Sequence, residues 1–160
     1  DTVTIEEKIM QLVSTPGHAS NHICLYDAGH RCLFSGDHII EGSSVLINPP
    51  DGDMKSYLNS MKKIETFDIN YIAPAHGGII DNPYEVIKQT VNHRLEREQK
   101  IIECLRLHPK IKLSDLVKYA YDDTVTEIHF LAERSLLAHL LKLKKENIVI
   151  MDENKWCLVL

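Results

Sequence analysis

The sequence has 160 residues, of which 44% are hydrophobic and 26% charged, and its formal net charge is −5. These values are typical of a soluble globular protein, and without a signal peptide or a long apolar run we expect a cytoplasmic protein that does not enter a membrane. The four cysteines are scattered without a Cys-x-x-Cys pair, which argues against a disulfide framework and against a structural zinc knuckle.

Short apolar runs in the first half of the chain predict strands. Residues 9–13 form such a run, and Pro16 ends it because proline has a fixed φ and no N–H to donate. The β-prone runs Ile23–Tyr26 and Arg31–Ser35 flank a short turn and are predicted to form a hairpin. A further strand is predicted over Asn70–Ala73.

Three of these strands end at a residue that can bind a metal ion. The segments concerned are Thr15-Pro16-Gly17-His18, Ser35-Gly36-Asp37 and Pro74-Ala75-His76-Gly77. Two imidazoles and one carboxylate suit Zn²⁺, Mn²⁺ or Fe, so His18, Asp37 and His76 are predicted metal ligands. The alternative is that they are loop residues with incidental spacing. Gly77 and Gly78 would let the backbone pass close to a bulky group.

The other histidines of this half are not predicted to be ligands. His22 and His30 flank the hairpin, and His38 follows Asp37 directly. We expect each of the three at the surface or beside the ligands.

The second half of the chain is mainly helical. Apolar spacing and capping signals predict helices over Met54–Ile64, from about Tyr84 to Leu107, after a Ser114 cap, and from a Thr124-x-x-Glu127 capping box to Lys145, then strands Ile148–Met151 and Trp156–Val159. Helices followed by a hairpin predict a winged helix. We therefore expect two domains, at residues 1–92 and 93–160.

The long predicted helix carries a second group of candidate site residues. Its apolar stripe is predicted to be Ile87, Val91, Leu95, Ile102 and Leu105. His93 lies off that stripe, and His93 and Arg94 together are candidates for contacting an anionic substrate.

The three strand-end segments resemble the second half of a metallo-β-lactamase-fold hydrolase. The long helix with its His-Arg pair and the C-terminal winged helix make the chain similar to the lactamase-beta-like protein 2 branch of that family. The resemblance implies an α+β fold, half of an αββα sandwich followed by a winged helix, in which the missing half would leave an apolar sheet face bare. The His-x-His-x-Asp-His cluster with which the family begins its metal site is absent from the sequence.

The resemblance also implies roles for the candidate ligands. Asp37 would bridge two divalent metals, zinc or manganese, and be the main catalytic residue, while His18 would bind the first metal and His76 the second. Because the N-terminal half is missing, we expect this chain alone to be inactive and to bind metal weakly or not at all. It would act once joined to that half, as the C-terminal portion of the enzyme.

Several functions stay open at this stage. The branch implies endoribonuclease activity on single-stranded RNA, with thioester hydrolysis of the glyoxalase-II type as the second candidate. A non-catalytic module that binds a partner chain, or a homodimer, is the alternative to an enzyme. Sequence-specific DNA binding by the winged helix is disfavoured, because residues 101–160 carry nine basic and nine acidic side chains and phosphate neutralisation dominates such affinity. We expect this domain to be a lid, a wall or a dimerisation surface.

Overall fold

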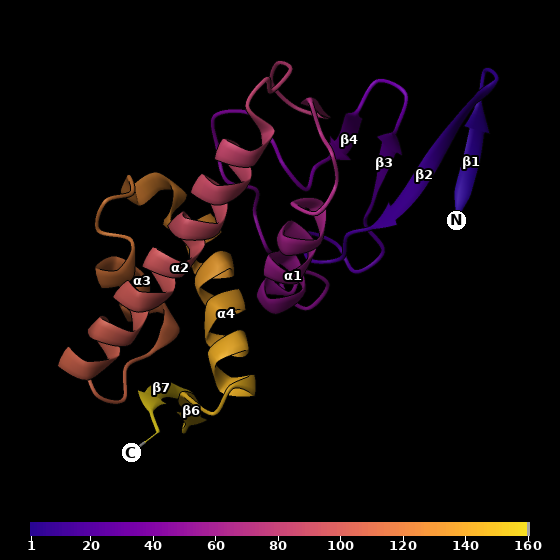
Figure 1. Ribbon diagram of the computed structural model, residues 1–160. Helices are drawn as coiled ribbons and strands as arrows, with labels where there is room; N and C mark the ends of the chain where they lie inside the picture. Colours follow the sequence, from indigo (N-terminus) through magenta and orange to yellow (C-terminus); the bar gives the residue numbers. More distant parts are fainter. Residues whose placement is uncertain (160) are drawn as a thin grey trace. The chain divides into compact units, whose positions relative to one another are not determined.

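The computed structural model describes residues 1–159, which form two compact units. The first unit comprises residues 1–45 and 51–91, and the second comprises residues 46–50 and the chain from Asn92 onward. Figure 1 shows strands in the first unit and mainly helices in the second. No helix in residues 1–159 is both long and apolar enough to cross a membrane.

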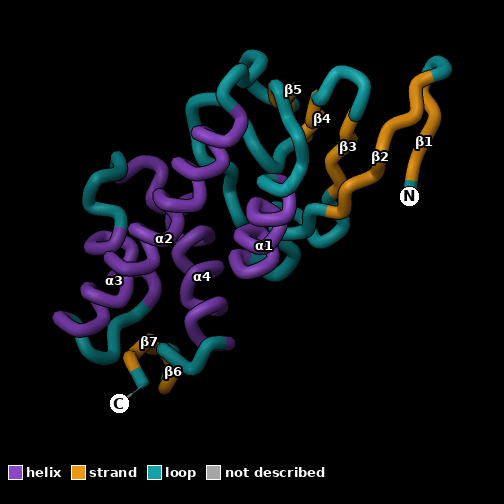
Figure 2. The backbone as a smooth tube through the Cα atoms, in the orientation of Figure 1, coloured by secondary structure: helices purple, strands orange, loops and turns teal. Residues whose placement is uncertain are grey.

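A five-stranded sheet forms the centre of the first unit, in the order β1-β2-β3-β4-β5. Strands β1 to β4 are antiparallel neighbours, and β5 pairs in parallel with β4. Figure 2 shows β1, β2, β3 and β4 side by side in orange. The elements are β1 (Thr2–Ile5), β2 (Lys8–Ser14), β3 (Ile23–Asp27), β4 (Cys32–Gly36), α1 (Met54–Ile64) and β5 (Tyr71–Pro74). The strands β2, β4 and β5 therefore run in the same direction and end at the same edge of the sheet.

The two faces of this sheet differ in exposure although both carry apolar side chains. One face is buried and consists of Val13, Cys24, Tyr26, Leu33 and Ile72. On the other face Leu12, Leu25 and Phe34 lie opposite one another across three strands, and Phe34 is 41% exposed. Ile23, on the same face, is 51% exposed. This is the bare apolar face that half of a sandwich was expected to leave.

The second unit packs helices and a hairpin around one core. Its elements are α2 (Pro83–Leu107, which begins in the first unit), α3 (Leu113–Ala120), η1 (Thr126–Ile128), α4 (His129–Lys145), β6 (Val149–Asp152) and β7 (Lys155–Leu158). The core includes Ile101, Leu116, Leu136, Leu140 and Trp156. Ile111 and Trp156 exchange backbone hydrogen bonds of 3.1 and 2.8 Å, which join the α2–α3 connection to β7.

Two helix starts differ from the prediction. Ser114 does not cap α3, because Lys112 occupies the N-cap position and makes no side-chain capping bond. The capping box at Thr124 is absent as well: residues 126–128 form a 3₁₀ turn, and α4 begins only at His129. The Thr124 hydroxyl contacts Asp123 Oδ1 at 3.5 Å rather than a helix N–H.

The buried side of α2 is more polar than the predicted stripe. Ile87 and Leu105 are buried as expected, but Leu95 is 46% exposed. Arg97 and Glu98 are buried in its place. They are tolerated there because both form charged contacts with other elements of the second unit.

Candidate metal site

Asp37 and His76 meet at the edge where β4 and β5 end. Gly36 lies opposite Pro74 in the register of these strands, and the Ala75 N–H donates to the Gly36 carbonyl at 3.0 Å. The parallel pairing therefore delivers the residues after each strand side by side. His76 Nε2 lies 3.3 Å from Asp37 Oδ1, and this buried oxygen accepts no hydrogen bond.

His18 reaches the same edge from β2, with His22 beside it. The ring centroids of His18 and His22 are 6.4 Å apart and the rings meet edge to face. Thr15 Oγ1 holds His22 through Nδ1 at 2.8 Å. Burial lowers the pKa of His22, and repulsion from the His18 imidazole lowers it further. The Asp37 carboxylate acts in the opposite direction and raises it. His18, His22 and Asp37 therefore lie close enough to interact electrostatically.

His38 lies behind this group and is fully buried. Its ring centroid is 5.3 Å from that of His22 and 4.6 Å from that of Tyr57, and neither of its ring nitrogens has a hydrogen-bond partner. Burial first, and then the neighbouring His22 and His18, lower its pKa to about 3, so the ring is neutral at pH 7. Of the two placements expected for His38, the surface is therefore wrong and a position behind the candidate ligands is right.

Two glycines fix the loops that carry the predicted ligands. Gly17 has φ 146°, and a Cβ there would lie 2.3 Å from the Tyr57 Cα, so the loop before His18 can rest directly on α1 only with glycine. Gly77 has φ 90°, and a Cβ there would lie 2.6 Å from the Cβ of Glu41. The bulky group expected beside Gly77 and Gly78 is therefore Glu41, whose Oε2 accepts the Gly78 N–H at 2.5 Å.

His93 and Arg94 belong to the other unit. Both lie on the part of α2 that begins the second unit, His93 at the surface and Arg94 only 4% exposed. Burial and the neighbouring Arg94 and Arg97 lower the pKa of His93. The predicted contact of these two residues with an anionic substrate stays a prediction.

The donor atoms at the sheet edge suit a divalent metal but do not complete a site. A carboxylate oxygen without a hydrogen bond next to an imidazole nitrogen is a suitable pair of donors for zinc or manganese. Within residues 1–159, however, no group of three His, Cys, Asp or Glu side chains is placed to hold a metal ion. Asp37 and His76 therefore fit part of a coordination shell but not a complete one.

Comparison with known proteins identifies the family. Residues 1–76 match the sequence model described as the metallo-beta-lactamase superfamily, and residues 113–156 match the beta-lactamase associated winged helix domain. Residues 1–76 therefore belong to the metallo-beta-lactamase superfamily. The predicted family and fold class are thereby confirmed.

Relatives of this metallo-beta-lactamase chain match across most of its length. It is 32% identical to the beta-lactamase-like protein 2 homolog of Caenorhabditis elegans, over 92% of this chain and 48% of that relative. It is 35% identical to the homolog of Drosophila melanogaster, over 89% of this chain and 48% of that relative. A protein of Emericella nidulans named thioesterase pkgB is 32% identical over 62% of the chain and 28% of its own length. The chain thus spans about half the length of the first two relatives.

A solved structure supports the same fold. The metallo-beta-lactamase family protein from Thermus thermophilus superposes with a TM-score of 0.87 at 19% identity, covering 99% of this chain and 52% of that one. The chain therefore has the fold of about half of that protein.

Proposed function

We propose that this chain supplies the C-terminal part of a dinuclear metal-dependent hydrolase. Asp37 would bridge the two metals, with His18 on the first and His76 on the second. The contact between Asp37 Oδ1 and His76 Nε2 carries this proposal. It places a carboxylate oxygen that accepts no hydrogen bond beside an imidazole nitrogen, and both atoms could bind a metal at the common end of β2, β4 and β5. When bound, two zinc or manganese ions would supply an activated hydroxide and stabilise charge on the scissile group.

The remaining ligands would come from the N-terminal half of the whole protein. Two observations support this division: residues 1–159 hold no group of three possible ligands, and the chain spans about half of its relatives. The residues of this chain would then hold and orient the metals from one side. His22 and His38 would keep neutral rings packed behind His18 and Asp37.

Single-stranded RNA is the substrate that we propose first. The relatives that match about nine tenths of the chain carry the name of the beta-lactamase-like protein 2 branch, to which the endoribonuclease expectation belongs. Thioester hydrolysis is the second candidate, because a relative matching 62% of the chain is named a thioesterase. A non-catalytic partner-binding module remains the alternative to both.

The whole protein, with its N-terminal half, provides the test. It should cleave a labelled single-stranded RNA when Mn²⁺ or Zn²⁺ is added and stop when a chelator is added, and a small thioester should be hydrolysed more slowly. Asp37→Asn should lower kcat/KM by at least about a hundredfold, the scale of losing electrostatic stabilisation of the transition state. Glu65→Gln, which removes an exposed carboxylate on the C-cap of α1, is the matched control. Full activity of Asp37→Asn would refute the mechanism. Faster hydrolysis of the thioester than of the RNA would refute RNA as the first substrate and favour the thioester instead.

A further inference from the structure

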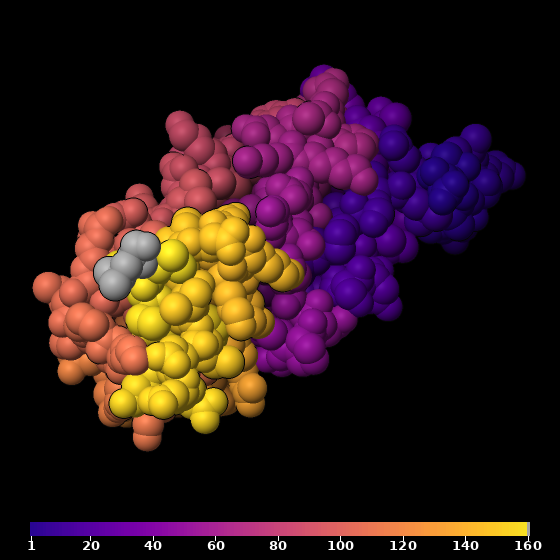
Figure 3. Space-filling view, turned by 90° about the horizontal axis from the view of Figure 1, so that it is seen from below, coloured from indigo at the N-terminus to yellow at the C-terminus, as the bar shows by residue number. Residues whose placement is uncertain are grey.

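A cavity of about 660 Å³ opens on the second unit, between the end of α2, α3 and β7. Its lining carries four lysines and one carboxylate, namely Lys110, Lys112, Lys118, Lys155 and Asp115. In Figure 3 the salmon to orange residues of this part of the chain border the yellow C-terminal residues. The balance of nine basic and nine acidic side chains in residues 101–160 therefore hides a local excess of positive charge.

Two of the four lysines form no ion pair within residues 1–159, although the charge of Lys112 contributes to lowering the pKa of the nearby Asp115 carboxyl. Lys118 is paired with Asp115 at 2.8 Å and Lys110 with Asp152 at 2.6 Å. Among the residues that the structure describes, Lys112 and Lys155 make no ion pair and no side-chain hydrogen bond. They come from two segments that meet at the antiparallel bridge between Ile111 and Trp156, since Lys112 is the N-cap of α3 and Lys155 begins β7.

An aromatic platform forms another part of the lining. The rings of His108 and Tyr119 are stacked, with centroids 4.1 Å apart and planes within 22° of each other. Tyr119 is 45% exposed, so a flat π surface is available to a ligand. The pair is fixed at both ends, because His108 follows α2 with its N–H bonded to the Cys104 carbonyl and Tyr119 lies on α3.

We propose that this cavity binds single-stranded RNA, with Lys112 and Lys155 on phosphates and a base stacked on the platform of Tyr119 and His108. Single strands are bound by grooves that combine cations along the backbone with aromatic rings under the bases. A free inorganic anion would use the lysines but not the platform, and an apolar peptide would use neither lysine. The choice of RNA rests on the proposed function, but binding at this cavity needs neither the metal site nor catalysis.

Fluorescence anisotropy on the full 160-residue chain tests the proposal. The probe is a labelled single-stranded RNA of about 12 nucleotides, titrated at several salt concentrations from about 50 mM upward in the presence of chelator. The double variant Lys112→Ala/Lys155→Ala should flatten the slope of log affinity against log salt by about 1.4, since each phosphate contact on a single strand contributes about 0.7. The control Lys62→Ala/Lys144→Ala removes two exposed lysines outside the cavity and should leave the slope unchanged.

The platform is tested separately. Tyr119→Ala should weaken binding at least about fivefold, the lower end of the effect of losing one base stack, whereas Tyr119→Phe should bind as the parent chain does. An abasic RNA of the same length should bind equally to Tyr119→Ala and to the parent. Circular dichroism checks that each variant is folded.

Four results would overturn the proposal. They are the absence of RNA binding at the lowest salt, binding to single-stranded DNA without binding to RNA, an equal change of slope in the control variant, and an equal effect of Tyr119→Ala on abasic RNA. Because chelator is present throughout, RNA binding without turnover in the whole protein would uphold this site while refuting the proposed function. RNA turnover in the whole protein without the predicted changes in these variants would refute this binding site while upholding the proposed function.

Discussion

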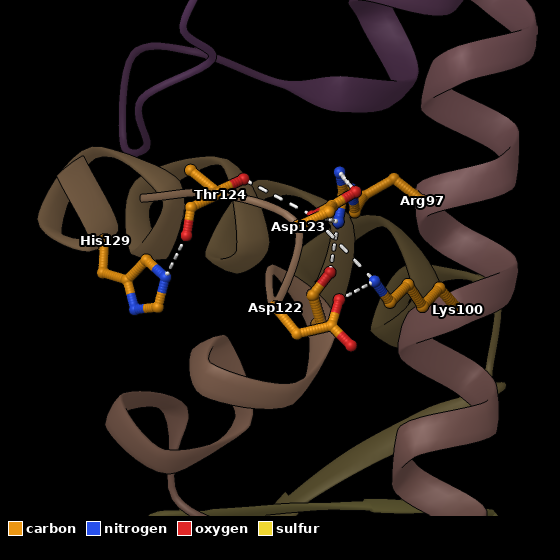
Figure 4. Close-up of polar contacts among 7 residues, drawn as sticks. Arg97, Lys100, Asp122, Asp123, Thr124 and His129 are labelled. Atoms are coloured by element: carbon orange, nitrogen blue, oxygen red, sulfur yellow. Dashed lines mark hydrogen bonds and ion pairs between the residues drawn. The ribbon is translucent and has the colours of Figure 1, made fainter. Parts of the chain in front are cut away.

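Arg97 is predicted to be a main polar support of the second unit. Its Nη1 and Nη2 donate to Oδ1 and Oδ2 of Asp123, both at 2.9 Å, and Nη1 also donates to the Ala120 carbonyl (Figure 4). The guanidinium carbon lies 4.2 Å from the centroid of the Tyr121 ring. The Arg97 side chain is 9% exposed and that of Asp123 is 56% exposed. One buried cation thus ties the middle of α2 to the end of α3 and to the loop that follows it.

The expected cost of Arg97→Ala follows from these contacts. The pair with Asp123 is screened by solvent on the carboxylate side, so we assign it about 1 kcal/mol. The bond to the Ala120 carbonyl adds about 1.5 kcal/mol, and the contact with Tyr121 adds about 0.5 kcal/mol. Arg97→Ala should therefore lower the free energy of unfolding by about 3 kcal/mol and Asp123→Asn by about 1 kcal/mol.

Urea unfolding followed by circular dichroism measures these differences. Lys100→Ala is the matched control, because Lys100 pairs with Asp122, whose side chain is 64% exposed, and reaches Asp123 Oδ1 only at 3.9 Å (Figure 4). It should cost less than about 1 kcal/mol. The hydrogen bond from Arg97 is the main cause that lowers the pKa of Asp123 to about 2, against an ordinary 3.8. The stabilisation is therefore complete above about pH 4 and is lost as pH falls towards 2. Equal losses for Arg97→Ala and Lys100→Ala would refute the reasoning.

Three further predictions concern other parts of the chain. Burial lowers the pKa of His139 below its ordinary 6.5, so as pH falls through about 6.5 the unfolded chain binds more protons at this group than the folded chain does. Stability should therefore fall as pH falls, by at most about 1.4 kcal/mol per pH unit, and His139→Gln should flatten this slope in unfolding curves between about pH 7 and pH 5. The bare sheet face should make the isolated chain self-associate at roughly tens of micromolar in light scattering, and a monomeric parent chain would contradict the idea. The variant Ile23→Lys/Phe34→Lys should reduce self-association, whereas Val125→Lys, at a still more exposed apolar site in the other unit, should not. Calorimetry should find weak or no binding of Zn²⁺ or Mn²⁺ to this chain alone, and submicromolar binding abolished by His18→Ala and His76→Ala would contradict an incomplete shell.

Local sequence signals located most of the elements. Helix α1 has the predicted bounds, and β2 to β7 and α2 lie within a few residues of theirs, because apolar period and proline act over short distances. The capping signals failed at Ser114 and Thr124, where the backbone took a different course before each helix. The strand β1 was not predicted, since its four residues are all exposed and give little burial pattern.

The candidate site could be predicted only as far as strand direction determines it. Asp37 and His76 follow strands that pair in parallel, so their proximity follows from the order of elements once the sheet is known. The burial of His38 does not follow in this way, because it depends on α1 bringing Tyr57 against the ring, a contact between segments far apart in sequence.

The buried polar face of α2 could not be predicted from local sequence either, because its stability depends on partners elsewhere in the chain. Periodicity assigns Leu95 to the core and Arg97 and Glu98 to the surface, since charged side chains are rarely buried without partners. Those partners are Asp123, His139 and Lys142, which lie between 26 and 44 residues further along the chain. A charged residue on a helix can therefore be assigned to the core only when the groups that compensate it are known, and these are set by the tertiary fold.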